Sequence, residues 1–161
     1  MSVTRLRLLL AAPIALAALA ASPLDPAARA AVSASVRSFA QQVAQGITQD
    51  GPRAWQRYFD SSPQFFMAVN GRLQFADGAS AQQGIAALPG VIRRISLRWG
   101  DDLRVDPLTP DLAVVAASYT EELESPDGHK RSERGFFTAL AEQDGHQWRF
   151  RNAHWSSLPA P

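Results

Sequence analysis

The chain contains no cysteine among its 161 residues. This absence excludes a disulfide framework, a metal site built on thiolates and a lipid anchor attached to cysteine. An oxidising compartment is permitted by this composition but not required. With 46% hydrophobic residues, the chain is long enough to bury one core and too short for two ordinary domains.

An excess of charge of either sign is also missing. The sequence has 16 basic and 15 acidic residues, and removing an N-terminal leader that carries Arg5 and Arg7 leaves 14 basic against 15 acidic ones. This balance lacks the basic footprint of a nucleic-acid-binding protein, so no nucleic-acid partner is expected. Lys130 is the only lysine, and all other basic residues are arginine. We attribute this preference for arginine to codon bias rather than to phosphate recognition.

Long hydrophobic runs are absent except at the N-terminus. There Arg5 and Arg7 precede a run of alanines and leucines, the order of a secretory signal. Ala18 and Ala20 match the small-residue cleavage pattern, so residues 1–20 are predicted to be a signal peptide and residues 21–161 the mature domain. An uncleaved anchor is the alternative, but the run is shorter than the ~20 residues that span a bilayer. We expect an exported protein, periplasmic or secreted, with no membrane attachment after cleavage.

Three helices are predicted in the first half of the mature chain. Asp25 and Pro26 have the residue types of an N-cap and a first helical position, and Gly51 and Pro52 end this helix and start the next. A third begins at Ser80 and stops at residues 89–90. The apolar positions of the first helix recur at spacings of three and four: Val32, Val36, Phe39, Val43 and Ile47. Those of the second are Trp55, Tyr58 and Phe59.

The remaining segments are typical of antiparallel strands. Asn70 and Gly71 separate two apolar runs and predict a tight hairpin, because both residues tolerate positive φ. Residues 94–105 alternate between apolar and charged positions and predict one strand with two distinct faces. Turns at 127–128 and 144–145 connect three longer strands, and connections this short join antiparallel neighbours. Helices early and strands late predict an α+β domain.

Several motifs together carry a family resemblance. They are "WQRYFD" at 55–60, the strand 65–69 with its Gly71 turn, the helix start at 80–85, and "GHQWRFRNAHWS" at 145–156. The last is similar to a closing strand of the form Gly-x-x-Trp-x-(Ile/Phe)-x-x-x-His-x-Ser. On these motifs, almost all of the mature chain resembles the SnoaL-like branch of the nuclear transport factor 2-like superfamily.

The resemblance implies a cone-shaped fold. Three N-terminal helices and a small hairpin would pack on a strongly curved, mostly antiparallel sheet and leave an apolar cavity between them. Relatives use this cavity as isomerases, dehydratases, cyclases or epoxide hydrolases, while others only bind ligands or have lost the site. Many pair through the outer face of the sheet. The implied partners are therefore a small apolar or amphipathic molecule and a second copy of the chain. Separately, we expect no cofactor.

The closing strand supplies the first candidate catalytic residue, His154. Strict alternation places Trp148, Phe150, Asn152, His154 and Ser156 on one face, and Arg149, Arg151, Ala153 and Trp155 on the other. Burying an unpaired polar group costs about 2–7 kcal/mol, so the polar side chains of the first face need partners, and a ligand is one candidate for that role. We expect His154 to face the cavity, where histidine exchanges protons near neutrality. Alternatively, a backbone carbonyl or Asp60 satisfies it inside the fold.

Tyr58 and Asp60 are the other candidate catalytic residues. They flank the end of the second helix, and a tyrosine hydroxyl beside a desolvated carboxylate is the arrangement that ketosteroid isomerases use. Asp60 is alternatively a simple turn residue. The isomerases' carboxylates have no counterpart in the strand 65–69, and we find no arginine-centred carboxylate arrangement like that of the epoxide hydrolases. Glu121, Glu122 and Glu124 either place a carboxylate near the cavity mouth or form a solvated strand edge.

Aromatic residues spread along the chain predict a lining for a flat apolar ligand, although they also suit ordinary core packing. These candidate ligand-binding residues are Trp55, Phe66, Trp99, Tyr119 and Trp148, together with Asn152. No metal site is expected, because His129 and His146 lie in predicted turns and no histidine pair has ligand spacing with a carboxylate. The sequence leaves three functions open: a ligand-binding protein, an acid–base enzyme, and a non-catalytic dimerisation module.

Overall fold

The longest helix, α1 (Pro26–Asp50), forms as its end signals predict. In this computed structural model, which describes residues 24–158, the Asp25 side chain accepts a hydrogen bond of 2.8 Å from the amide of Ala28. Gly51 ends the helix with φ 80°. All five residues of the predicted apolar stripe are buried, which confirms the periodicity. The signal peptide and its cleavage site lie outside the described residues.

The two other predicted helices are shorter; the second begins at Pro52 as predicted, and the third begins before its predicted start. The second is a 3₁₀ segment, η1 (Pro52–Arg57), followed by a turn. The third is α2 (Gly78–Ala87), and Asp77 rather than Ser80 is its N-cap. Asp77 accepts from the Ser80 amide at 2.7 Å, while the Ser80 hydroxyl accepts from the Asp77 amide at 3.2 Å, so the two residues form a reciprocal capping box. A single 3₁₀ turn, η2 (Leu88–Gly90), follows α2.

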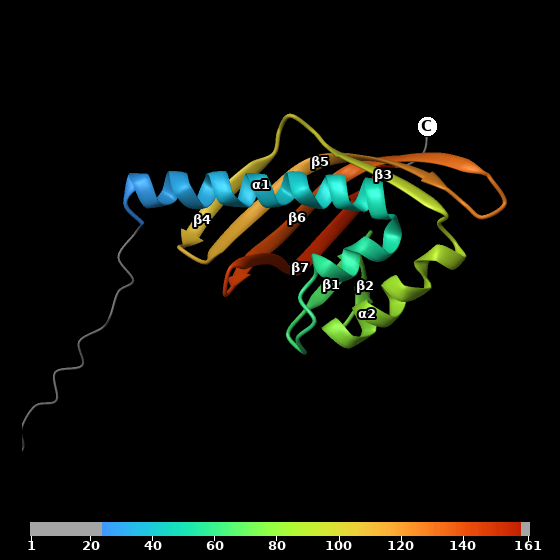
Figure 1. Cartoon of the computed structure of the whole chain (residues 1–161), viewed down its shortest axis with the longest axis horizontal. Coiled ribbons are helices and arrows are strands. Elements are labelled where there is room, and N and C mark those ends of the chain that lie inside the picture. Colours follow the sequence, from blue (N-terminus) through green and yellow to red (C-terminus); the bar gives the residue numbers. More distant parts are fainter. Residues whose placement is uncertain (1–23, 159–161) are drawn as a thin grey trace, which may run out of the picture.

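Seven strands form one curved sheet (Figure 1). The strands are β1 (Phe66–Val69), β2 (Arg72–Phe75), β3 (Arg94–Trp99), β4 (Arg104–Thr109), β5 (Leu112–Glu124), β6 (Lys130–Asp144) and β7 (Gln147–Ser157). Their order is β2-β1-β7-β6-β5-β3, and β4 pairs with the other end of β5. Every pair is antiparallel except β1 with β7. The β1–β2 hairpin turns at Asn70 and Gly71, both at positive φ, as predicted.

The single strand expected over 94–105 is in fact two, β3 and β4. The chain breaks at Gly100, where an added Cβ would collide with the hydroxyl of Ser118 on β5. Asp102 follows in the turn and accepts hydrogen bonds from the Ser118 amide at 2.9 Å and from its hydroxyl at 2.8 Å. These contacts bend the chain, so that β3 and β4 pair with different halves of β5.

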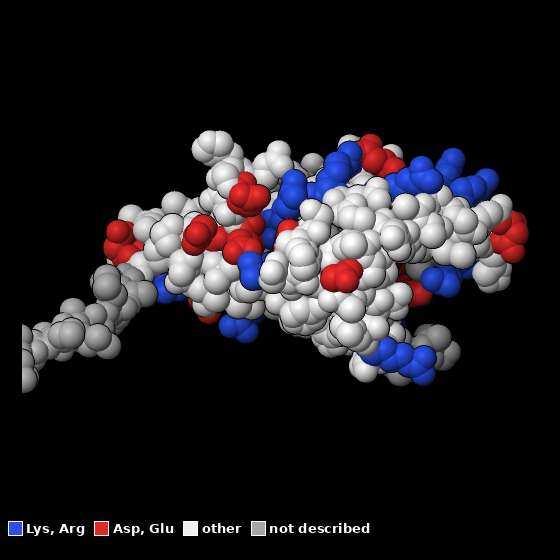
Figure 2. All heavy atoms as spheres, turned by 90° about the horizontal axis from the view of Figure 1, so that it is seen from below, with Lys and Arg blue, Asp and Glu red and all other residues white. Residues whose placement is uncertain are grey.

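Helices cover one face of the sheet and close one end of it. α1 lies across β3, β4 and β5, while η1 and α2 pack together beside the β1–β2 hairpin (Figure 1). The buried core fills the space between α1 and the sheet. On the face shown in Figure 2, acidic and basic groups are interspersed around a large uncharged area. Within residues 24–158, no helix is both long and apolar enough to cross a lipid bilayer.

A β-bulge in β7 overturns the predicted faces of the closing strand. Leu140 on β6 is opposite Asn152, but Ala141 is opposite Phe150, so Arg151 is an extra residue on β7. The bulge reverses the alternation for the rest of the strand. Trp148 and Phe150 face the core before it and Ala153 and Trp155 after it, whereas His154 is exposed. The prediction that His154 shares a face with Trp148 is therefore wrong.

Candidate ligand-binding cavity and carboxylate pair

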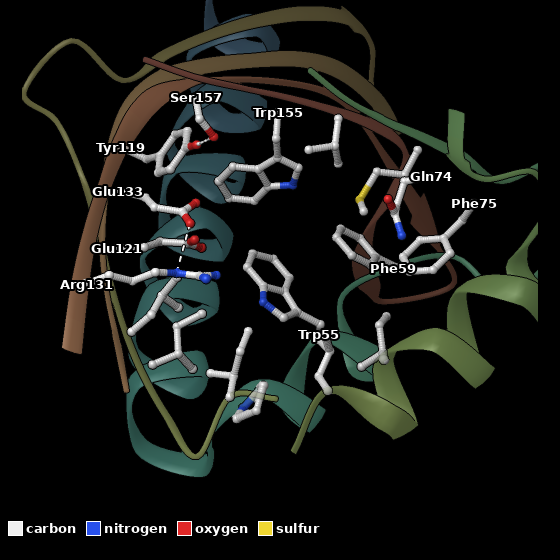
Figure 3. Close-up of a pocket in the computed structure, with 18 residues that line it drawn as sticks. Trp55, Phe59, Gln74, Phe75, Tyr119, Glu121, Arg131, Glu133, Trp155 and Ser157 are labelled. Carbon is white, nitrogen blue, oxygen red and sulfur yellow. Dashed lines mark hydrogen bonds and ion pairs between the residues drawn. The ribbon is translucent and has the colours of Figure 1, made fainter. Parts of the chain in front are cut away.

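A cavity of about 360 Å³ opens between the sheet and the elements that close its end (Figure 3). Strands β5, β6 and β7 form one wall, and η1, α2 and the β1–β2 hairpin form the other. This volume lies within the ~300–1,000 Å³ range of small-molecule pockets. The lining is mostly apolar: Pro52, Trp55, Phe59, Met67, Val69, Phe75, Ile85, Leu88, Ile92, Ile95, Leu123 and Trp155. Its polar members are Gln74, Tyr119, Glu121, Arg131, Glu133 and Ser157.

Aromatic rings form the inner part of the cavity. Trp55 stacks on Phe59 with ring centroids 5.0 Å apart, and it meets the edge of Trp155 at 5.6 Å. Trp155 in turn meets Tyr119 at 4.6 Å in a perpendicular arrangement. Contacts of this kind fix the rings, because each is held by a neighbour as well as by burial. The cavity therefore offers rigid aromatic surface to the apolar body of a ligand.

Most of the polar lining groups lie together on the strand wall. Glu121 on β5 is directly opposite Glu133 on β6, and both point to the cavity side of the sheet (Figure 3). Two residues before Glu133, Arg131 places its Nε 3.1 Å from Glu133 Oε1. The Tyr119 hydroxyl and the Ser157 hydroxyl lie 3.0 Å apart. Two carboxyl groups, one guanidinium and two hydroxyls thus face one region of the cavity.

Burial and the facing carboxylate change the protonation of Glu121. Burial, and to a smaller extent the charge of Glu133, raise its pKa to about 7, and Arg131 opposes the shift. Glu133 carries an ion pair with Arg131. Near neutral pH the wall therefore holds a carboxyl group that exchanges its proton next to a glutamate that is paired with an arginine. Burial also raises the pKa of the Tyr119 hydroxyl, which stays protonated and can donate a hydrogen bond.

Two of the six candidate ligand-binding residues, Trp55 and Tyr119, line this cavity. Trp99 lies behind the cavity wall, stacked on Trp155 at 5.9 Å, and its indole nitrogen donates to the Ala40 carbonyl at 2.7 Å. Trp148 lies at the far end of α1, where its indole nitrogen donates to the Ser35 hydroxyl at 2.9 Å. Trp99 and Trp148 therefore hold the helix against the sheet and do not line the cavity.

Phe66, Asn152 and His154 lie on the outer face of the sheet, in a shallow groove away from the cavity. Phe66 is 47% exposed, and His154 is exposed beside it. The Asn152 side chain accepts from the Leu140 amide at 3.2 Å, which places its amide group at the bulge. The expectation that His154 and Asn152 face the cavity is wrong, because the bulge at Arg151 turns both outward.

Tyr58 and Asp60 also lie outside the cavity. The Tyr58 hydroxyl donates to the Gln42 carbonyl at 3.2 Å, in a groove between α1 and the start of β7. Asp60 accepts hydrogen bonds from the amide and hydroxyl of Ser62, which is the geometry of a turn residue. His154, Tyr58 and Asp60 thus occupy three separate places, and the structure does not bring them together.

The sequence left two roles open for Glu121, a carboxylate near the cavity mouth or part of a solvated strand edge. It did not identify Glu133, Arg131 or Ser157 as cavity residues. A signal for Glu133 was present, since a β5–β6 hairpin that turns at Asp127 places it opposite Glu121 when residues are counted outward from the turn. No comparable signal identified Ser157, because its face depends on the β7 bulge. Among the described residues, no group of three or more His, Asp or Glu side chains is arranged to hold a metal ion.

Comparisons with known proteins find similar structures but no similar sequences. No family model matches the sequence, and no curated protein matches it significantly. Among solved structures, a nuclear transport factor 2-like superfamily protein from Salmonella enterica aligns with a TM-score of 0.68 at 12% identity, covering 81% of this chain and 94% of its own. The chain has the nuclear transport factor 2-like fold.

Two further structures with this nuclear transport factor 2-like arrangement illustrate its range. A proposed scytalone dehydratase from Novosphingobium aromaticivorans aligns with a TM-score of 0.65 at 9% identity, covering 77% of this chain and 82% of its own. A nuclear transport factor 2-like protein of unknown function from Shewanella oneidensis aligns at 0.57 and 16% identity, covering 75% and 95%. At these identities the likeness establishes the fold and not the activity.

Proposed function

We propose that this nuclear transport factor 2-like protein binds a small apolar or amphipathic molecule in the cavity. The observation that carries the proposal is the division of the lining: rigid aromatic surface on Trp55 and Trp155, and polar groups collected on the strand wall around Glu121. A ligand with an apolar body and one polar group matches this division. Pockets of this size and composition are the default small-molecule sites of proteins.

Filling the cavity tests the proposal. Leu88 lines the cavity on η2, and Leu88→Trp would occupy part of its volume. Val91 lies three residues later, is 63% exposed and is not in the lining, so Val91→Trp is the matched control. Isothermal titration calorimetry with 2-(1-naphthyl)ethanol should show binding to the parent protein and to Val91→Trp, and strongly reduced binding to Leu88→Trp. Equal binding to all three proteins would place the ligand elsewhere.

A second candidate function is acid–base catalysis at the same wall. The favouring observation is the Glu121–Glu133 pair, in which a carboxyl group with a pKa near 7 faces a second glutamate that is paired with Arg131, so that one group can donate a proton while the other accepts one. Isomerisation and dehydration both need this combination, and one structural neighbour is named as a proposed dehydratase. In this account the catalytic residues are Glu121 and Glu133 in place of His154, Tyr58 and Asp60.

The enzyme candidate is tested on a molecule that co-purifies with the protein. With that molecule as substrate, Glu121→Gln should bind it and fail to convert it, because glutamine keeps the shape of the side chain and cannot transfer the proton. His154→Ala should convert it at the parent rate. Unchanged turnover by Glu121→Gln would exclude catalysis by this pair, and the binding function would remain.

We propose further that the mature protein is exported and forms a homodimer. The order of the N-terminal segment supports export, and the uncovered apolar side chains on the outer sheet face support pairing of two copies. The intact mass of the protein from an exporting host tests the first part: the proposed cleavage predicts a chain that begins at Ala21.

A further inference from the structure

We infer that the cavity is built for a cationic amphiphile, an amine whose ammonium group lies at Glu121 and whose apolar body lies against Trp55 and Trp155. The inference rests on the proposed binding function and narrows it to one chemical class. It is carried by the geometry of the strand wall, where the acidic groups outnumber the basic ones.

The charges on the wall do not cancel. Arg131 is the single arginine or lysine in the described cavity lining, and its Nε is paired with Glu133 at 3.1 Å. This pair is neutral as a unit. Glu121 makes no ion pair or hydrogen bond with any described residue, although it lies beside that pair. When Glu121 ionises, the cavity therefore carries one uncompensated negative charge, which an ammonium group neutralises.

The surroundings of Glu121 supply a binding surface for the rest of a cationic ligand. On its own strand Tyr119 and Leu123 flank it on the cavity side, and Glu133 and Arg131 face it from β6. Ser157 lies beside Tyr119 at the end of β7, and Trp55 approaches from η1 across the cavity (Figure 3). Aromatic faces attract ammonium groups through the ring quadrupole, and the attraction grows as water is excluded. Tyr119, Trp55 and Trp155 provide such rings in the same cavity as the carboxyl group.

Binding of an amine is then coupled to loss of a proton. Burial and Glu133 together raise the pKa of Glu121 to about 7 in the empty cavity. A nearby cation favours the carboxylate, so the ligand displaces the proton as it binds. For a group with this pKa, the ionised fraction rises about tenfold between roughly pH 6 and 8. The affinity for an amine should rise by the same factor, while that for a neutral alcohol should stay constant or fall.

Two probes with the same apolar body test the inference: 2-(1-naphthyl)ethylamine and 2-(1-naphthyl)ethanol. The amine stays protonated at both pH values, as the side chain of lysine does. Calorimetric titration of the mature protein should show the amine binding about tenfold more tightly at pH 8 than at pH 6. At pH 8 it should also bind more tightly than the alcohol. Titrations near pH 6 in two buffers of different ionisation enthalpy should reveal protons released on binding.

Variants at neighbouring positions separate Glu121 from general surface charge. Glu121→Gln should bind both probes alike and lose the pH dependence, because the charge is gone while the shape is kept. Glu122→Gln is the matched control, since Glu122 is exposed on the outer face and accepts from the Ser132 hydroxyl at 2.9 Å. This control should keep both the preference for the amine and its pH dependence.

The outcomes also separate this inference from the proposed function. If the alcohol binds in the cavity as tightly as the amine at pH 8, or if the pH dependence survives in Glu121→Gln, the inference is overturned and the binding function stands. If neither probe binds the parent protein, both are overturned. Loss of amine binding in Leu88→Trp, with retention in Val91→Trp, is expected if the amine occupies the same cavity.

Discussion

At the scale of single residues, the stability of the fold is coupled to the ionisation of Glu121. Its pKa is about 7 in the folded protein and 4.5 as an ordinary glutamate. The folded state therefore binds more protons than the unfolded state between these values, and the free energy of unfolding falls as the pH rises from 4.5 to 7. Above this window the lost stability is not regained, because Glu121 is ionised in both states.

Glu121→Gln removes this pH dependence. The variant should melt at a higher temperature than the parent protein at pH 8, where the parent holds two facing carboxylates, and at nearly the same temperature at pH 4, where Glu121 is neutral. Thermal denaturation followed by circular dichroism across this range measures the difference. A constant difference at every pH would show that the ionisation of Glu121 is not coupled to folding.

Gly135 lets the Tyr119 ring approach the backbone of β6 closely at the cavity wall. The two residues are opposite each other on β6 and β5, and a Cβ at Gly135 would collide with the Ser156 carbonyl and lie 2.8 Å from Tyr119 Cε1. Gly135→Ala should destabilise the protein by about 1–3 kcal/mol, the usual cost of overpacking. Gly90→Ala is the control, because its Cβ would meet nothing within 4 Å. Urea denaturation compares them, and equal stabilities would contradict the close approach.

At the scale of secondary-structure elements, the bulge in β7 decides which residues belong to the core. Trp155 is buried against four aromatic rings, so Trp155→Ala should cost about 3–5 kcal/mol of unfolding free energy. His154→Ala should change stability by less than about 0.5 kcal/mol, since His154 is exposed on the outer face. Denaturant titrations of the two variants test the assignment. A reversed order would mean that β7 alternates without a bulge.

Some of these elements could be predicted from the sequence alone and others could not. α1 and the β1–β2 hairpin were predictable, because their caps and turn residues act within a few positions along the chain. The bulge was not, because Arg151 becomes an extra residue only through pairing with Leu140 and Ala141 on another strand. The bulge also changed which residues line the cavity. Trp55 and Tyr119 line it, as the sequence patterns predicted. On β7, however, His154 points outward, and the neighbouring Trp155 lines the cavity in its place.

At the scale of the whole molecule, the outer face of the sheet is the predicted dimer interface. Phe66, Val114 and Phe136 are exposed there on three different strands. Sedimentation equilibrium of the mature protein should give the mass of two chains, and Phe136→Arg should shift it towards one by placing two buried charges against each other. Val91→Arg, at an exposed site away from the strands, should remain dimeric. A monomeric parent protein would leave the outer face without this role.

The central claim is that the protein holds a small molecule in its cavity, and native mass spectrometry tests it most directly. The parent protein, Leu88→Trp and Val91→Trp would be purified from the same exporting host and measured in native and denaturing conditions. The account predicts a mass excess on the parent protein and on Val91→Trp that disappears on denaturation, and its absence or marked reduction on Leu88→Trp. The same excess on all three proteins would contradict a ligand held in the cavity.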